Sequence, residues 1–310
     1  MCYYLFSRKE VNPVMKNIEN RYLGIVILSY VIWGFLTLFW NILVEVDSMY
    51  ILSQRIIWSM VFMALYMTAA KKWDEIKEIF RDKKSFAICF VSGALITINW
   101  GVYIYAVNNG HVLDSSLGYF IEPIMVALFG LVLFKESMSK AEKFTFVLAT
   151  AAVIYLVVVN RTFPVIALVI TLSFSAYGAV KKSLNISAHA SLFMETLCMT
   201  PFALLLAVYM EINGTGVIGK LPPSTMVFLP ICGIVTSVPL LLFNIGVKKI
   251  PLYMIGILNY ISPTISFILG LIYFHETLDK PRFVAFLLIW FGILFIIVEK
   301  LRLTKTQRAN

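Results

Sequence analysis

Charged residues are scarce in this chain. Only 14% of its 310 residues are charged, whereas soluble globular domains carry about 25%. Hydrophobic residues make up 60% of the chain, and the mean hydropathy is +0.86. So little charge cannot cover the surface of a globular protein in water, which excludes an ordinary soluble domain and favours lipid as the solvent.

Residues that carry metal or nucleophilic chemistry are also few. The three histidines and the four cysteines, Cys2, Cys89, Cys198 and Cys232, show no metal-ligand spacing, and no GxSxG elbow occurs. "GTGVIG" (214–219) fits a dinucleotide pattern, but that pattern needs a preceding strand and a βαβ unit, which this sequence does not offer. We therefore expect no enzyme, no cofactor and no metal site.

Long apolar runs dominate what is present. A helix needs about 20 apolar residues to cross a hydrocarbon core about 30 Å thick. Ten stretches meet this requirement, with short polar links between them: 24–44, 50–70, 86–107, 112–134, 141–159, 163–180, 189–210, 226–247, 252–274 and 282–299. The sequence thus predicts an all-α integral membrane protein with ten transmembrane helices.

The net charge of +9 reflects topology. With ten spans both termini lie on one side, and 21 of the 26 Lys and Arg residues fall on that side, four on the other and one, Arg55, inside a span. This positive-inside bias places both termini in the cytoplasm and argues against a nucleic-acid partner. Residues 1–14 fit either an upstream extension or a disordered tail.

An internal repeat divides the chain. "LGYFIEPIMVALFGLVLFKE" (117–136) matches "ILNYISPTISFILGLIYFHE" (257–276) at an offset of 140, a register that extends back to Gly93 and Gly233. "LSYVIWG" (28–34) matches "LSFSAYG" (172–178) at an offset of 144. We therefore predict two five-helix repeats, 21–160 and 163–300, flanked by cytoplasmic tails 1–20 and 301–310.

Because five is odd, the second repeat must enter the membrane from the opposite face. Inverted repeats of this kind are typical of secondary transporters, which enclose a site near the midplane. Pro123 and Pro263 occupy matched positions, and a proline removes one backbone hydrogen bond. The repeat predicts matched breaks in spans 4 and 9, with packing alone as the alternative role of both prolines.

Three charged residues inside spans are candidate site residues. A charge at the bilayer centre costs at least about 2.5–3.5 kcal/mol, so it faces a cavity or a partner. Glu122 lies close to the midplane, and Arg55 could pair with it or with Asp114. Glu195, the repeat mate of Arg55, is expected on the opposite side of the midplane, as a second gate or anchor. The alternative for each is a charge satisfied within the bundle.

Aromatic and amide side chains at similar depths are further candidates for the cavity wall. Trp33 and its mate Tyr177 stand beside Gly34 and Gly178, which permit close approach of helices. Their rings could hold an aromatic or cationic substrate, or could simply pack between helices. The remaining candidates are Trp100, Tyr103, Tyr119 and Tyr260, with Asn99 and Asn259 as hydrogen-bonding residues.

Several motifs resemble one known family. "YVIWG" (30–34), "QRIIWS" (54–59), "NWGVYIYAVNNG" (99–110), "LGYFIEP" (117–123) and "METLCMTP" (194–201) resemble the RarD-type, or chloramphenicol-sensitivity, group of the EamA family in the drug/metabolite transporter superfamily. The resemblance covers nearly all of 20–300. It implies a ten-helix permease of the bacterial inner membrane with a central cavity.

From the repeat and this resemblance we expect a secondary transporter that moves a small organic metabolite or drug by alternating access. A passive channel or a membrane-embedded sensor is the alternative. The expected partners are membrane lipid and a small-molecule substrate, with a coupled proton or an exchanged metabolite left open.

Overall fold

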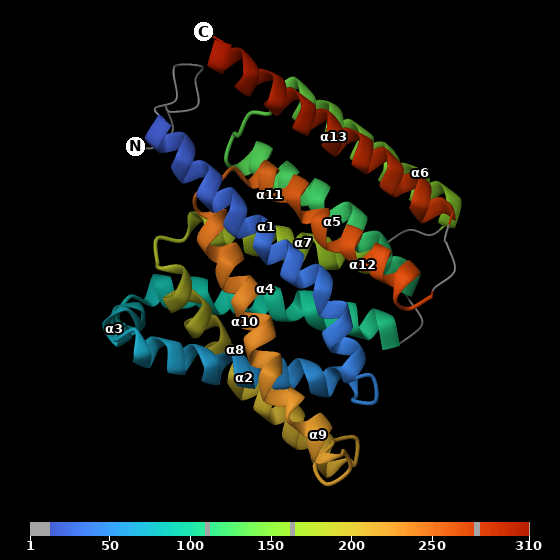
Figure 1. The fold of residues 1–310 in the computed structure, drawn as a ribbon. Coiled ribbons are helices and arrows are strands. Elements are labelled where there is room, and N and C mark those ends of the chain that lie inside the picture. Colours follow the sequence, from blue (N-terminus) through green and yellow to red (C-terminus); the bar gives the residue numbers. More distant parts are fainter. Residues whose placement is uncertain (1–12, 109–111, 162–164, 276–279, 310) are drawn as a thin grey trace.

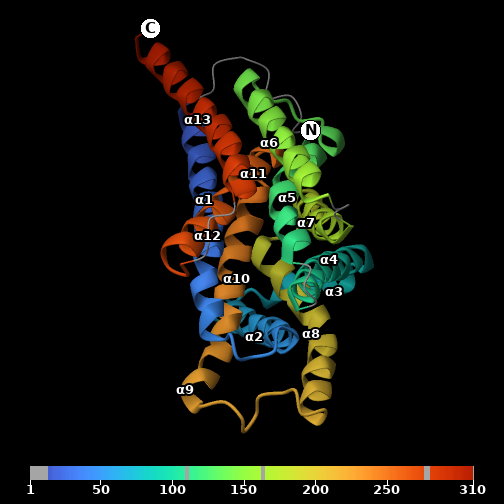
Figure 2. The ribbon, with the colours of Figure 1, turned by 90° about the vertical axis from the view of Figure 1, so that its right-hand side faces the viewer.

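The chain is a bundle of long helices, as a computed structural model shows (Figures 1 and 2). The structure describes the backbone of residues 13–108, 112–161, 165–275 and 280–309, and the side chains of 20–106, 118–159, 161, 165–275 and 280–299. The side chain of Asp114, and all of His111 and Glu276, lie outside the described residues, as does the tail segment 1–12.

Thirteen helices account for the described residues, none of which forms a strand. In chain order they are α1 Pro13–Ile42, α2 Ser48–Ala69, α3 Trp73–Arg81, α4 Lys83–Asn108, α5 Val112–Leu133, α6 Lys140–Asn160, α7 Val165–Ser183, α8 Ala188–Ile212, α9 Pro223–Met226, α10 Phe228–Val247, α11 Leu252–Asn259, α12 Ile261–Ile272 and α13 Lys280–Ala309.

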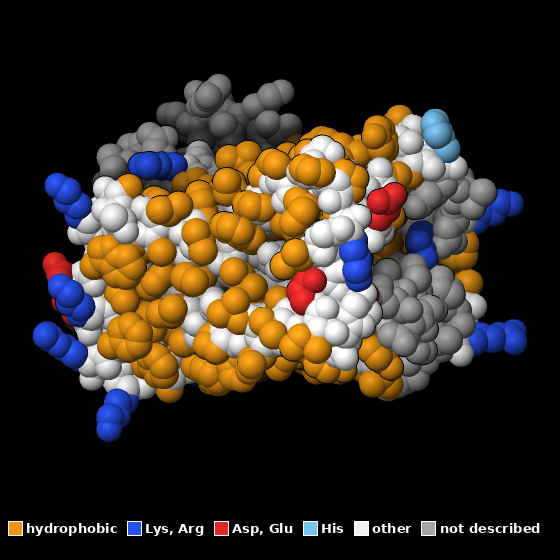
Figure 3. Space-filling view, turned by 90° about the horizontal axis from the view of Figure 1, so that it is seen from below, with side chains coloured by type: hydrophobic (Ala, Val, Ile, Leu, Met, Phe, Trp, Pro, Cys, Tyr) orange, Lys and Arg blue, Asp and Glu red, His pale blue; other side chains and the backbone are white. Residues whose placement is uncertain are grey.

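The helices suit a lipid environment. Among the described residues nine spans are long and apolar enough to cross a membrane, and Gly118–Leu133 of α5 is a shorter apolar stretch. Hydrophobic side chains cover the middle of the face in Figure 3, and basic side chains extend from its two ends. The start of α1 and the end of α13 lie at the same end of the bundle (Figure 1). The structure agrees with the ten predicted helices.

Helix boundaries follow local capping chemistry. Asp47 begins α2 by accepting hydrogen bonds from the backbone N–H groups of Met49 and Tyr50. Ser139 and Glu142 form a reciprocal capping box at the start of α6.

The sequence did not predict α3, a short amphipathic helix within the polar link between the second and third spans. α13 also continues to Ala309, through the segment expected to be a tail.

Packing between helices respects the internal repeat. α2 packs against α8, and α6 against α13, so repeat mates face each other. The contact of α4 with α8 has its counterpart in that of α10 with α2, and the contact of α4 with α7 in that of α10 with α1. The two repeats therefore interlock, and their common axis passes between α2, α4, α8 and α10.

The predicted matched breaks at the two prolines occur in only one repeat. Span 9 is interrupted at Tyr260, three residues before Pro263, and forms α11 and α12. Span 4 is continuous through Pro123, so the prediction of a break there was wrong. α5 and α11 approach closely at this level: a Cβ at Gly256 would lie 2.4 Å from the Pro123 carbonyl oxygen, and the Tyr260 hydroxyl donates to the Phe120 carbonyl at 3.0 Å. These contacts hold α5 against α11 beside the proline.

Candidate functional site

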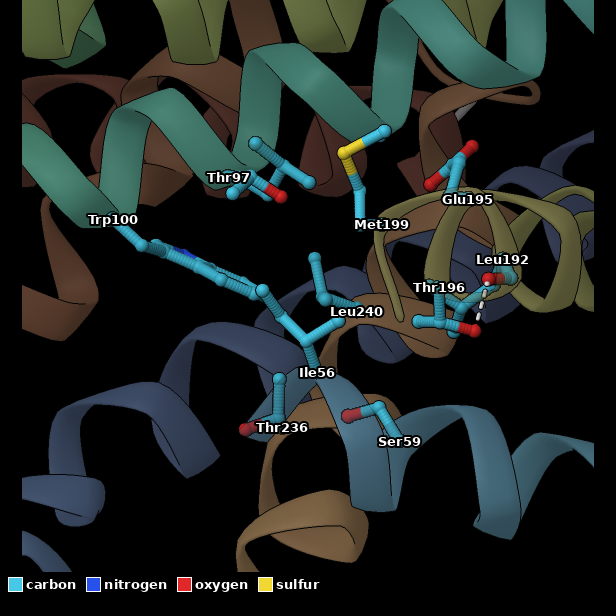
Figure 4. Close-up of a pocket in the computed structure, with 12 residues that line it drawn as sticks. Ile56, Ser59, Thr97, Trp100, Leu192, Glu195, Thr196, Met199, Thr236 and Leu240 are labelled. Carbon is cyan, nitrogen blue, oxygen red and sulfur yellow. Dashed lines mark hydrogen bonds between the residues drawn. The ribbon is translucent and has the colours of Figure 1, made fainter. Parts of the chain in front are cut away.

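A small cavity lies between α2, α4, α8 and α10 (Figure 4). Its volume is about 20 Å³, and a cavity needs roughly 10–15 Å³ to hold one water molecule. This space is therefore too small for an organic substrate in the described structure. The lining residues are Ile56, Ser59, Gly93, Ile96, Thr97, Trp100, Leu192, Glu195, Thr196, Met199, Thr236 and Leu240.

Repeat mates line this cavity together. At the offset of 140 found in the sequence, four mate pairs contribute both members to the wall: Ile56 and Thr196, Ser59 and Met199, Ile96 and Thr236, and Trp100 and Leu240. The cavity therefore lies on the axis that relates the two repeats. This is where an inverted-repeat transporter holds its substrate.

Arg55 stands at one end of the cavity. Its guanidinium carbon lies 4.2 Å from the ring centre of Trp100 and 4.8 Å from that of Trp40, and its Nε donates to Thr236 Oγ1 at 3.1 Å. Trp100 and Thr236 both line the cavity, on the side away from Glu195 (Figure 4). No carboxylate among the described side chains forms an ion pair with Arg55.

Glu195 stands at the other end, where buried donors surround it. Its Oε1 forms an ion pair with Lys181 Nζ at 2.5 Å and accepts hydrogen bonds from Ser92 at 2.9 Å and Ser191 at 2.8 Å. Lys181 is 0% exposed and Glu195 is 1% exposed. The hydrogen bonds and the ion pair among these four side chains thus join α4, α7 and α8 at this end.

Tyr177 extends the Glu195 network to α10. Its hydroxyl lies 3.2 Å from Glu195 Oε2 and 3.1 Å from Asn244 Oδ1, yet it has one proton to donate. The buried Asn244 Nδ2 has no hydrogen-bond partner among the described residues. Turning the Asn244 amide over would direct Nδ2 at the Tyr177 oxygen and leave the hydroxyl proton for Glu195. All groups around Glu195 then act as donors.

Glu122 lies apart from the cavity wall. It is 7% exposed, and its Oε1 accepts a hydrogen bond from Asn259 Nδ2 at 2.7 Å, next to the break between α11 and α12. The sequence allowed an ion pair with Arg55, but Glu122 and Arg55 do not pair. Asn259 supplies the polar partner that makes a carboxyl group tolerable here.

Glu122→Gln is expected to change the free energy of unfolding by less than about 1 kcal/mol, because a carboxamide keeps the acceptor for Asn259. Glu122→Leu leaves the buried Asn259 amide unpaired and is expected to cost about 1–3 kcal/mol. Thermal unfolding of both variants in detergent measures the difference. Equal destabilisation by Gln and Leu would show that the hydrogen bond to Asn259 contributes nothing.

The other candidates are placed as follows. Asn99 donates to the Ile170 carbonyl at 2.7 Å and joins α4 to α7. Trp33 packs among Tyr30, Phe174 and Phe243, with ring centres 5.5–6.3 Å away. Tyr103 and Tyr119 form an edge-to-face pair, and Tyr260 and Pro123 are buried between helices. Of the predicted site residues, Trp100 and Glu195 line the cavity and Arg55 borders it.

Lys181 is the residue of the Glu195 network that the sequence did not single out. It looked like one of two basic residues at the cytoplasmic end of a span, where lysines are common. The structure places it in the last turn of α7, fully buried. The available signal was spacing: Lys181 follows Tyr177 by four residues and so shares its helix face.

Lys248, just past the end of α10, is expected to make stability depend on pH. Burial, with a smaller contribution from the positive charge of Lys181, lowers the pKa of Lys248 to about 8. The unfolded chain, with a lysine pKa near 10.4, binds more protons at this residue between about pH 8 and pH 10.4, so the Lys248 contribution to stability rises with pH there. Thermal unfolding at pH 7.5 and 9.5 should show this rise, and Lys248→Met should remove it. An unchanged rise in Lys248→Met would contradict the assignment.

The fold and cavity define a multi-pass helical membrane protein built from two interlocked copies of one unit. The EamA-like transporter family model matches residues 21–158 and again 163–298, so the chain belongs to the EamA-like transporter family. The family and the names of the relatives below indicate a membrane transporter of the drug/metabolite type rather than an enzyme.

Relatives match over nearly the whole chain. A "Protein RarD" from Streptomyces exfoliatus is 32% identical over 91% of this chain and 90% of its own, and a "Protein RarD" from Escherichia coli is 30% identical over 91% and 94%. An "Uncharacterized transporter YojE" from Bacillus subtilis is 33% identical over 91% and 95%. A solved crystal structure shares the fold, with a TM-score of 0.69 over 89% of this chain and 97% of its own at 15% identity.

Proposed function

We propose that this protein is a secondary transporter that moves a small organic solute across the bacterial cytoplasmic membrane by alternating access around the α2/α4/α8/α10 cavity. The observation that carries the proposal is the cavity wall itself, which is built from repeat mates. Two copies related by an axis through the site can exchange conformations, so that the site opens first to one face and then to the other.

Two side-chain groups are suited to close the two ends. At one end Lys181, Ser92, Ser191 and Tyr177 converge on Glu195, and at the other Arg55 joins Trp40, Trp100 and Thr236. The basic residues at the ends of α7 and α10 follow the positive-inside bias, which supports a cytoplasmic position for the Glu195 end and for both termini. Separation of one group would open one face.

Transport can be driven by a proton gradient or by exchange with a second metabolite. Glu195 is the carboxylate best placed for proton coupling, because it lines the cavity and touches an ionisable lysine. Uptake into proteoliposomes with and without an imposed pH gradient, or with preloaded solute, separates these modes.

The proposed function is tested by reconstituting the full chain in liposomes and measuring uptake of labelled amino acids, organic acids and cationic aromatic compounds. Saturable uptake is expected for at least one class, and Thr97→Trp, which fills the cavity, should abolish it. A passive channel would instead give steady ion conductance in planar bilayers, and a sensor would give neither. Failure of every class in the panel, with folded protein, would overturn the proposal.

A further inference from the structure

The two charged ends of the cavity are not equally neutralised. Glu195 has Lys181 as its counter-ion and hydroxyl donors besides. Arg55, its repeat mate, has two indole rings and one threonine oxygen. Counted over the described side chains, Arg55, Glu195 and Lys181 leave the cavity with one uncompensated positive charge.

The repeat explains why no counter-ion for Arg55 comes from the first span. At the offset of 144 that relates α1 to α7, the residue in the first copy that corresponds to Lys181 is Thr37. Thr37 is neutral and donates its hydroxyl to the carbonyl of Gly34 at 3.1 Å. The first repeat therefore carries Arg55 on its second span, where the second repeat carries Glu195. Its first span, however, has the neutral Thr37 where the second repeat has Lys181.

The guanidinium geometry leaves a defined set of donors. Arg55 uses Nε for Thr236, and no hydrogen bond from its terminal Nη groups occurs among the described residues. Guanidinium groups bind carboxylates through two parallel N–H···O bonds, and their faces stack on aromatic rings. Here the guanidinium carbon lies over the rings of both Trp40 and Trp100, and the terminal N–H donors remain for an anion.

Arg55 is half-buried within a spanning helix, and a positive charge at that depth is unfavourable unless an anion or water compensates it. We infer that the substrate of the proposed transporter carries a carboxylate, which the Nη groups of Arg55 bind in the plane of the guanidinium between Trp40 and Trp100. The inference rests on the proposed function. A single cation matches a singly charged carboxylate better than a doubly charged phosphate, and Trp100 supplies a flat apolar wall for the group next to the carboxylate.

Binding is tested on the purified full-length protein by intrinsic tryptophan fluorescence, with three probes that share a benzyl group: phenylacetate, phenylacetamide and phenethylamine. Phenylacetate is expected to bind at least tenfold more tightly than the amide and the amine. Arg55→Gln should remove this preference, and Arg55→Lys, which keeps the charge but loses the planar fork, should retain only part of it. Arg81→Gln, at an exposed position on α3, is the matched control and should leave the preference intact.

Several outcomes would overturn the inference: no binding of phenylacetate, equal affinity for acid and amide, a preference that survives Arg55→Gln, or tighter binding of the dianion phenylphosphonate. If Arg55→Gln fails to fold, Thr236→Val removes the acceptor that aims the guanidinium and should weaken phenylacetate binding severalfold. The same probes in proteoliposomes separate the two proposals. Uptake without carboxylate preference would overturn the inference alone, whereas Arg55-dependent binding without uptake of any compound would overturn the transport function alone.

Discussion

Replacement of Lys181 by methionine is expected to lower the free energy of unfolding by about 3–5 kcal/mol, because it leaves the buried Glu195 carboxylate without its cation. Methionine keeps much of the length and volume of lysine, so the loss of charge is the main change. Thermal unfolding in detergent measures the effect, and the double variant Lys181→Met with Glu195→Gln should recover much of it.

The control for this prediction is an ion pair at the surface. Lys77 and Asp74 lie 2.8 Å apart, but both side chains are mostly exposed, so Lys77→Met should have only a small effect on stability. Similar losses in Lys181→Met and Lys77→Met would show that burial of the Lys181–Glu195 pair carries no energetic weight. A double variant no more stable than Lys181→Met would show that the lysine acts through packing rather than charge.

Gly233→Ala is expected to destabilise the fold by at least about 1–3 kcal/mol through overpacking where α10 crosses α2. A Cβ at Gly233 would lie 2.3 Å from the carbonyl carbon of Trp58 and 2.8 Å from the backbone nitrogen of Ser59. Backbone atoms cannot rotate away, so the two helices must separate beside the cavity. The yield of folded, monodisperse protein and its thermal midpoint measure the cost.

Gly101→Ala is the matched control, since it changes a glycine in another spanning helix. Its Cβ would meet a Leu52 methyl at 3.8 Å, an ordinary contact, and alanine favours helix more than glycine does. Gly101→Ala should therefore be neutral or slightly stabilising. A Gly233→Ala protein as stable as Gly101→Ala would contradict the close crossing of α2 and α10.

Much of the architecture follows from the sequence because lipid imposes strong constraints. Spanning helices must be long and apolar, and the repeat at an offset of 140 indicates which helices share an environment. The same offset connects Arg55 to Glu195, which the structure places at opposite ends of one cavity. The lining pairs of repeat mates lie on the second and third spans of each repeat. The offset of 140 therefore already indicates which residues of these spans share the cavity wall.

Side-chain partners could not be predicted in the same way. A carboxylate in a spanning helix demands a polar neighbour, but Asn259 and Lys181 satisfy that demand equally well in principle, and only the packing decides. The proline prediction failed for a related reason: Pro123 removes a donor, yet α11 packs over it and α5 stays continuous. The sequence shows that a buried carboxylate requires a polar partner and that a proline removes a backbone hydrogen bond. Tertiary contacts determine which residue is the partner and whether the helix is interrupted.

The proposed alternating access requires the cavity between α2, α4, α8 and α10 to open to both faces in turn. A single cysteine at Thr97, in a variant with Cys2, Cys89, Cys198 and Cys232 replaced, tests it in sealed proteoliposomes with a membrane-impermeant thiol reagent. The cysteine is expected to react when the reagent is present on either side alone, and a transported solute is expected to slow both reactions. A cysteine that reacts from one face only, or from neither, would contradict alternating access at this cavity.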